Sequence, residues 1–300
     1  ALMPRRAVLM IAAVLFPGAL EAQLVPGRDL LSFPIGLTAE APALGTTAGF
    51  GLWNPASVVI APGNRARLAV GTMSAPVDVA VTAQVAAVGV RFRDGTTYAI
   101  GMAHASVGDL LRTDSDPQSI GDEITYTTTL MSLIAARPVG PVTLGTALRV
   151  RSGTLDNIAR RAVSLDVGAI SRGLGAHDVR LAASTFLASP FSREHEKAEL
   201  LLAADARLVG ADTLRTGRAG LSYTAADGMP REAFGYLSGR WQRLEGRLGA
   251  ARTEAYGRTN WRGRLGIAFH HRGYVIGVAR EESAGNLSAT YQFTLSSVLK

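Results

Sequence analysis

Residues 142–151 read VTLGTALRVR, and this stretch decides the fold. The even-numbered positions carry apolar side chains and one threonine, whereas the odd-numbered positions carry small residues and then Arg149 and Arg151. A period of two is typical of a β-strand, because successive side chains point to opposite faces of a sheet. The stretch therefore predicts a strand with one face toward apolar surroundings and the other toward water.

The same alternation recurs along the chain from about residue 65. We count about fourteen such segments, many of them about ten residues long, the length that crosses a bilayer at a tilt. One segment changes phase between Val85 and Val88, so we expect a β-bulge near Ala86 and Ala87. The fourteen segments are centred near residues 69, 86, 100, 130, 146, 167, 182, 204, 220, 236, 248, 265, 277 and 291.

The predicted connections alternate in length. Short ones are expected at residues 94–95, 138–141, 171–176, 210–213, 242 and 271–273, and longer polar ones at 106–123, 152–161, 189–197, 225–231, 253–260 and 281–285. The first, 74–78, is short and breaks the trend. Outer-membrane barrels combine tight periplasmic turns with long outer loops, and an even strand number then places both termini in the periplasm. The last strand, 286–298, has to pair with 66–73 because an unpaired edge in lipid is costly.

The predicted fold class is therefore all-β, a transmembrane antiparallel β-barrel of about fourteen strands with a short N-terminal plug segment. A water-soluble sandwich or solenoid is the alternative, because alternating strands also build those folds. The strand number, the alternating loops and the charges on the less apolar face favour the barrel. Aromatic residues are few, but two thin girdles can be drawn from Tyr98, Tyr126, Tyr223, Tyr236, Trp241, Tyr256, Trp261, Tyr274 and Tyr291.

The N-terminus resembles a secretory signal peptide. Arg5 and Arg6 precede an apolar run, residues 7–16, and small residues surround Ala22, after which we expect cleavage. No later run approaches the 18 or so apolar residues of a membrane-spanning helix. We therefore expect a signal peptide at 1–22, an N-terminal plug or periplasmic segment at 23–64, a barrel at 65–300, and localisation in the outer membrane.

Composition argues against several function classes. Cysteine is absent, and the net charge of +7 rests on arginines that are spread singly, so we expect neither thiol chemistry nor nucleic-acid binding. We find no nucleophile elbow, and the pairs His195-Glu196 and His270-His271 lack metal-ligand spacing. The loop acids Asp109, Asp114, Asp116, Asp122 and Glu123 could hold a divalent cation, but ordinary solvation is favoured. We predict no enzyme activity, no catalytic or metal residues and no cofactor.

Charged residues recur on the predicted inner face, where a polar interior tolerates them. They are Arg149, Arg151, Asp166, Asp178, Arg180, Glu199, Asp205, Arg207, Arg218, Glu245, Arg247, Arg262 and Arg264. Such charges either pair to fill the lumen or form a constriction that screens solutes. Paired filler is favoured, and the candidates for lumen lining are Arg149, Arg180, Arg207 and Arg264.

Residues 51–57 read GLWNPAS and come just before the first predicted strand. Asn54 and Pro55 are typical turn openers, because the Asn side chain bonds nearby backbone and proline fixes φ. The Asn54-Pro55-Ala56 motif resembles that of the FadL-like outer-membrane proteins, including the PorV/PorQ group. The resemblance implies a fourteen-stranded barrel with an N-terminal plug and makes these three residues binding-site candidates. The motif serves either as a plain turn or as part of a gate, and the fuller glycine-rich and paired-acidic pattern of the PorV group is absent.

The resemblance implies passive transport of small, hydrophobic molecules. The alternative is a PorV-like secretion or surface-assembly component that binds a secreted protein partner, and a purely structural barrel is a third option. The expected partners are outer-membrane lipid and a small hydrophobic ligand or a secreted protein, with no nucleic acid.

Overall fold

The computed structural model describes residues 25–31, 39–45, 50–75, 80–113, 120–189, 198–210, 214–225, 231–255, 258–282 and 289–300. The expected signal peptide lies outside these ranges. So do Asp114, Asp116, His195, Glu196 and Tyr256, so their predicted surroundings stay predictions.

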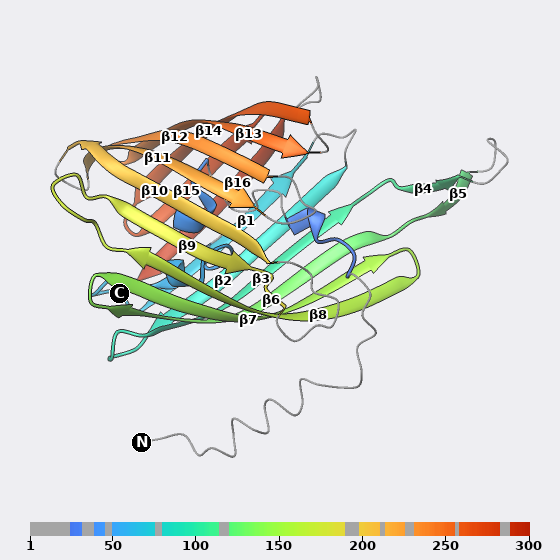
Figure 1. The fold of residues 1–300 in the computed structure, drawn as a ribbon, viewed down its shortest axis with the longest axis horizontal. Coiled ribbons are helices and arrows are strands. Elements are labelled where there is room, and N and C mark those ends of the chain that lie inside the picture. The colour runs from blue at the N-terminus through green and yellow to red at the C-terminus, as the bar shows by residue number, and fades with distance from the viewer. Residues whose placement is uncertain are drawn as a thin grey trace, which may run out of the picture.

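Fourteen strands form a closed antiparallel barrel in which each strand pairs with its neighbours along the chain (Figure 1). A separate two-stranded sheet, β4 (Leu111–Thr113) with β5 (Ile120–Glu123), lies in the connection between β3 and β6. The barrel strands are β1 (Ala66–Ser74), β2 (Val81–Arg91), β3 (Thr97–Val107), β6 (Tyr126–Val139), β7 (Val142–Leu155), β8 (Ile158–Ser171), β9 (Arg180–Phe186), β10 (Glu199–Val209), β11 (Arg215–Ala225), β12 (Arg231–Trp241), β13 (Leu244–Ala255), β14 (Arg258–His271), β15 (Tyr274–Glu281) and β16 (Thr290–Leu299).

The strand pairing confirms the predicted fold class. Each of the fourteen predicted centres falls within one barrel strand. The barrel closes through β1 and β16, which pair from Ala66 opposite Leu299 to Ser74 opposite Tyr291. Closure leaves the sheet without a free first or last strand, as a bilayer demands.

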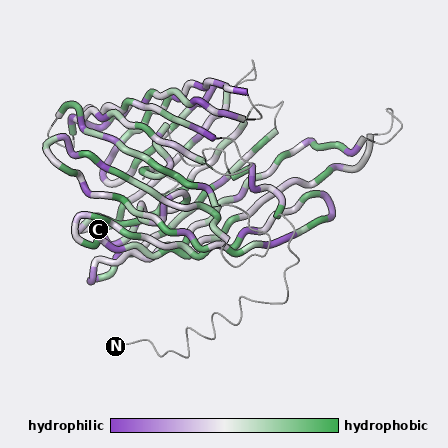
Figure 2. The backbone as a smooth tube through the Cα atoms, viewed as in Figure 1, coloured by the Kyte–Doolittle hydropathy of each residue, from purple (hydrophilic) through white to green (hydrophobic). Residues whose placement is uncertain are grey.

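The two faces of the wall follow the predicted parity. Leu144, Ile267 and Tyr291 are 50, 62 and 44% exposed on the outer surface, whereas Arg149 and Asp166 are fully buried on the inner one. Figure 2 shows the resulting alternation of hydrophobic and hydrophilic residues along the strands. An apolar outer wall around a closed barrel is suited to lipid, and the chain is an outer-membrane β-barrel.

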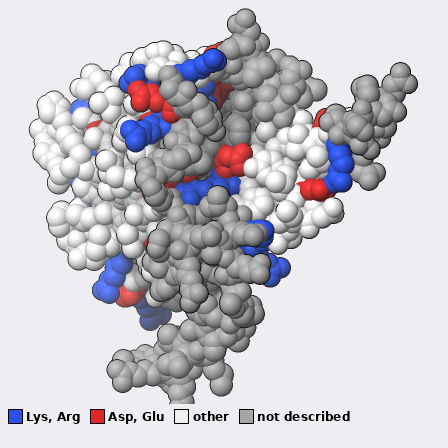
Figure 3. Space-filling model, turned by 45° about the vertical axis from the view of Figure 1, so that its right-hand side comes forward, with Lys and Arg blue, Asp and Glu red and all other residues white. Residues whose placement is uncertain are grey.

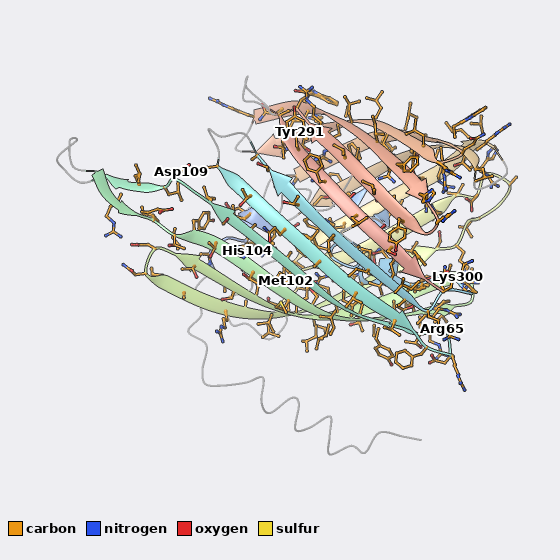
Figure 4. The ribbon with its side chains drawn as sticks, turned by 180° about the vertical axis from the view of Figure 1, so that it is seen from behind. Arg65, Met102, His104, Asp109, Tyr291 and Lys300 are labelled. Carbon is orange, nitrogen blue, oxygen red and sulfur yellow. The ribbon has the colours of Figure 1, made fainter. Side chains whose placement is uncertain are left out.

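The two ends of the barrel differ. Arg65 and Lys300, which flank β1 and β16, lie at one end together with the tight turns, and Asp109 lies at the other end with the longer connections (Figure 4). By the usual asymmetry of such barrels, the first is the periplasmic end and the second is the outer end. The β4–β5 hairpin projects beyond the rim at the outer end (Figure 1).

Several finer predictions are wrong. No bulge interrupts β2, whose pairing with β1 and β3 is continuous through Ala86 and Ala87. Val81 and Val85 point inward and Val88 points outward without a change of phase, because the inner wall is apolar there. The connections expected at 152–161 and 253–260 are much shorter, because β7, β8, β13 and β14 extend further toward the outer end.

Two of the expected girdle tyrosines lie inside the barrel. Tyr236 is 8% exposed and donates a hydrogen bond to Asp205, and Tyr126 donates one to Asp29. Tyr98, Trp241, Trp261, Tyr274 and Tyr291 are exposed on the outer wall, as expected.

The N-terminal segment, defined here as residues 25–31, 39–45 and 50–60, lies against the inner wall. It contains three short helical turns, η1 (Asp29–Leu31), η2 (Pro42–Leu44) and η3 (Pro55–Val58). Turn η3 contacts β6, β7 and β8, and η2 contacts β9 and β10. The expectation that both ends of the mature chain lie on the periplasmic side is wrong for residues 25–31, which contact the outer half of β7.

Candidate functional site in the barrel interior

The N-terminal segment runs along the barrel from the outer end to the periplasmic end. Near the outer end, Arg151 Nη1 donates to the carbonyl oxygens of Val25 and Pro26 at 2.9 and 3.0 Å. Near the periplasmic end, the backbone N–H of Ile60 donates to Thr97 Oγ1 at 3.3 Å. The described parts of the segment therefore reach from the outer half of β7 to the periplasmic end of β3 before β1 begins.

Asn54 joins three parts of the interior. Its Oδ1 accepts from the backbone N–H of Ala56 at 2.9 Å, which caps η3, and Pro55 occupies the first position of that turn. Its Nδ2 donates to the carbonyl oxygens of Ala43 at 2.9 Å and Ala169 of β8 at 3.3 Å. The motif thus caps η3 and holds it to Ala43 and to β8 by hydrogen bonds. Its role in binding or gating stays a prediction.

Glycines in β7 and β8 make room for this segment. A Cβ atom on Gly168 would lie 2.0 Å from Asn54 Oδ1, and one on Gly145 would lie 2.4 Å from the backbone N of Ala56. A side chain at either position is incompatible with so close an approach, so the wall of β7 and β8 is shaped to the segment.

A fully buried ion pair lies beside these glycines. Arg149 Nε is 2.6 Å from Asp166 Oδ2, and both side chains have no exposed surface. Arg149 Nη2 also donates to the carbonyl oxygen of Gly51 at 3.2 Å, and its guanidinium stacks 5.1 Å from the ring centre of Phe186. Because a buried charge needs a partner, the wall and the N-terminal segment depend on each other here.

A carboxylate hub occupies the periplasmic half of β9 to β12. Asp205 accepts hydrogen bonds from Arg180 Nε at 2.9 Å, from Arg218 Nη2 at 2.9 Å and from Tyr236 at 3.1 Å. Arg218 Nη1 also donates to Asp178 at 2.6 Å. All five residues belong to the wall or its turn, so this network does not depend on the N-terminal segment.

A second network lies in the outer half of β12 to β15. Arg262 Nη2 and Arg264 Nη2 donate to Glu232 at 2.7 and 2.9 Å, and both arginines also pair with Glu281. The guanidinium of Arg264 lies 4.7 Å from the ring centre of Phe234, which is buried. In Figure 3, charged side chains lie in several groups toward the ends of the barrel, while much of the wall between them is uncharged.

One ion pair connects the N-terminal segment to the far wall. Arg247 Nη2, on β13, lies 2.6 Å from Glu40 Oε1 and 2.7 Å from Glu245 Oε1. His270 Nε2 lies 2.8 Å from the other oxygen of Glu245. Glu40 therefore ties residues 39–45 to β13, across the lumen from the β7 and β8 wall.

The four predicted lumen-lining arginines do not form one site. Arg149 pairs beside Gly51, Arg180 belongs to the Asp205 hub, and Arg264 belongs to the outer network. Arg207 lies at the periplasmic rim and donates to the carbonyl oxygen of Ala176 at 3.3 Å. Three of the four arginines are therefore engaged in ion pairs, as expected of paired charges that fill the lumen. A role in lining a transport path stays a prediction for all four.

The sequence analysis did not identify three carboxylates of these networks. Glu232 and Glu281 fall at strand ends, close to the expected loops, although each shares the inward parity of its strand. Glu40 lies where no periodicity exists, so no local signal could pair it with Arg247. Within the described residues, no group of three metal-ligating side chains could hold an ion, and no helix is long and apolar enough to span a membrane.

Comparison with known proteins supports the fold. No protein-family model matches the sequence, and no curated protein matches it. A mutant of TodX, described as a monoaromatic hydrocarbon channel, matches with a TM-score of 0.57 at 9% identity, over 88% of this chain and 98% of that one. A triple mutant of the Rhodopseudomonas blastica porin and OprB from Pseudomonas putida both match with a TM-score of 0.43 at 9% identity, over 78% of this chain and 99 and 92% of theirs. The likeness to TodX shows a similar barrel fold, and neither a family model nor a curated protein supports the PorV/PorQ group.

Proposed function

We propose that this outer-membrane barrel passes small, hydrophobic molecules across the membrane by diffusion. The observation that carries the proposal is the apolar part of the interior, since a general porin has a polar one. Inward side chains of β2 and β3 are apolar and belong to one buried cluster with apolar side chains of the N-terminal segment. They include Val81, Ala83, Val85, Ala103 and Ala105 on the wall, and Leu30, Leu31, Leu44 and Phe50 on the segment.

The N-terminal segment acts as the plug in this proposal. Phe50 lies against β2 and η1 contacts β3, while η2 lies against β9 and β10, so a hydrophobic solute can pass the segment only if part of it moves. Residues 50–60 are set into the glycines of β7 and β8, whereas residues 39–45 depend on the tie from Asn54 and on the Glu40–Arg247 ion pair. The piece that moves is therefore residues 39–45.

Uptake by intact cells that express the barrel tests the proposal. We expect faster entry of a monoaromatic hydrocarbon than in cells without the barrel, and no change for a sugar of similar size. A Val85→Thr variant makes the inner wall more polar at nearly constant volume, and it should reduce hydrocarbon entry while heat-modifiability stays unchanged. Faster entry of the sugar alone would contradict the proposal.

A secretion or surface-assembly role is the second candidate, supported by the β4–β5 hairpin. The hairpin is braced against the β7–β8 turn, where Arg112 Nη2 lies 2.5 Å from Asp156 Oδ2. Replacing residues 108–124 with a short turn should abolish capture of a protein partner if this role is correct. Under the transport proposal, the same replacement leaves hydrocarbon entry intact.

A further inference from the structure

Exposed cations encircle the periplasmic end of the barrel. Six of them, called here the periplasmic ring, are Arg65, Arg93, Arg137, Arg172, Arg243 and Arg272, and all are exposed. They lie beside β1, in the β2–β3 turn, near the end of β6, after β8, in the β12–β13 turn and in the β14–β15 turn. The ring is therefore spread around the circumference rather than gathered on one side. Figure 4 shows Arg65 at this end, away from Asp109.

Carboxylates do not neutralise these cations. Within the described residues, no member of the ring lies within ion-pair distance of a carboxylate, and the charge of Arg137 acts on Asp94 only at longer range. At the outer end, some exposed arginines have partners at 2.5 and 2.8 Å in the pairs Arg252–Glu254 and Arg280–Glu282, whereas Arg161, Arg231 and Arg258 are in no ion pair within the described residues. The ion pairs between two exposed side chains thus lie at the outer end, and no such pair is found among the cations of the periplasmic ring in the described residues.

Aromatic side chains set the depth of the ring in the membrane. Trp241 is 62% exposed on the outer wall, and the guanidinium of Arg215 lies 4.5 Å from its ring centre. Phe92 and Tyr98 form an exposed edge-to-face pair at 5.3 Å beside the β2–β3 turn. Tryptophan and tyrosine concentrate at the level of lipid headgroups, so the cations just beyond them meet those headgroups.

We propose that the periplasmic ring binds the phosphates of anionic phospholipids in the inner leaflet of the outer membrane. A leaflet surrounds the barrel on every side, as the ring does, whereas a protein partner would require a patch on one side. Lysine and arginine next to a negatively charged leaflet attract it over about a Debye length, and the attraction weakens with salt. The phospholipid shell at this end is therefore enriched in anionic species.

Two tryptophans report separately on the two ends. Trp241 lies next to the ring, Trp261 lies near the outer end, and Trp53 is buried in the interior at 3% exposure. The experiment uses Trp261→Phe to report on the periplasmic end and Trp241→Phe to report on the outer end. Each is reconstituted in phosphatidylcholine vesicles with increasing brominated phosphatidylglycerol, whose bromines quench nearby tryptophan fluorescence.

We expect phosphatidylglycerol to be enriched several-fold over its bulk share around Trp241 at low salt and not around Trp261. The triple variant Arg93→Gln, Arg172→Gln, Arg243→Gln should abolish the enrichment at Trp241. The matched triple variant Arg161→Gln, Arg231→Gln, Arg258→Gln removes three exposed charges from the outer end and should leave it unchanged. Equal quenching at the two tryptophans, or an equal loss in the two triple variants, would overturn the proposal.

Discussion

The interior has two walls that are stabilised in different ways. On β7 and β8, the buried Arg149–Asp166 pair and close-approach glycines contact the N-terminal segment directly. On β9 to β15, Asp205, Glu232 and Glu281 are satisfied by arginines of the wall itself. The first wall meets the segment through close backbone packing beside a fully buried ion pair, while the second meets it through the ion pairs Arg247–Glu40 and Arg28–Glu199. The difference indicates which parts of the interior can move independently.

The largest expected effect comes from removing one partner of the buried pair. Asp166→Asn leaves the Arg149 charge buried without its counter-ion, and we expect a loss of about 3–5 kcal/mol in the free energy of unfolding. Asp205→Asn should cost less, about 1.5–3 kcal/mol, because its arginines are partly exposed and Arg218 keeps Asp178. Urea unfolding in lipid vesicles measures both, and a larger loss for Asp205→Asn would reverse the comparison.

Filling a glycine tests the fit between segment and wall. Gly168→Ala places a methyl group against the Asn54 side chain, and overpacking of this kind costs about 1–3 kcal/mol. Gly239→Ala is the matched control, since a Cβ at that position has no neighbour within 4 Å. Heat-modifiability on a denaturing gel compares the two, and similar midpoints would show that the segment is not set closely into β8.

Weakening the Glu40–Arg247 ion pair should change the mobility of residues 39–45 more than the free energy of unfolding. Glu40→Gln weakens the contact with Arg247, which keeps Glu245, so we expect a loss of about 1 kcal/mol or less. Amide exchange in residues 39–45 should become faster while exchange in 50–60 stays constant. Glu254→Gln, which breaks an exposed pair with Arg252, serves as the control. Faster exchange in both parts would mean that the segment moves as one body.

The smallest expected effect on stability concerns Asp94, in the β2–β3 turn. Hydrogen bonds from the Thr96 side chain and backbone N–H lower the pKa of Asp94 below its ordinary value of 3.8. A carboxyl with a lowered folded pKa stabilises the folded state above its unfolded pKa, and this contribution is lost as the pH falls through the folded pKa. Thr96→Val should therefore be slightly less stable than wild type at neutral pH, with the difference shrinking in acid. A difference that grew toward low pH would contradict this assignment.

Periodicity predicted the wall because a membrane barrel imposes strict alternation on every strand. It failed at β2, where Val81 and Val85 are apolar on the inner face because they belong to a buried cluster shared with the N-terminal segment and do not face water. It could not find the Glu40–Arg247 pair, since a contact between residues so far apart leaves no local pattern. The number of strands and the direction of their side chains can thus be predicted from local sequence, whereas the contacts inside the lumen cannot.

The course of the N-terminal segment constrains how the barrel can be assembled. Residues 25–31 lie toward the outer end, yet β1 starts at the periplasmic end, so the chain passes through the lumen once before the wall begins. Pairing of β1 with β16 then closes a continuous hoop of hydrogen-bonded strands around it. After closure, the segment can enter or leave the lumen only along the barrel axis, because the strands block any sideways path. The segment must therefore be laid inside before the seam closes or be drawn in along the axis afterwards, and a stably folded domain fused ahead of Val25 would obstruct the second route.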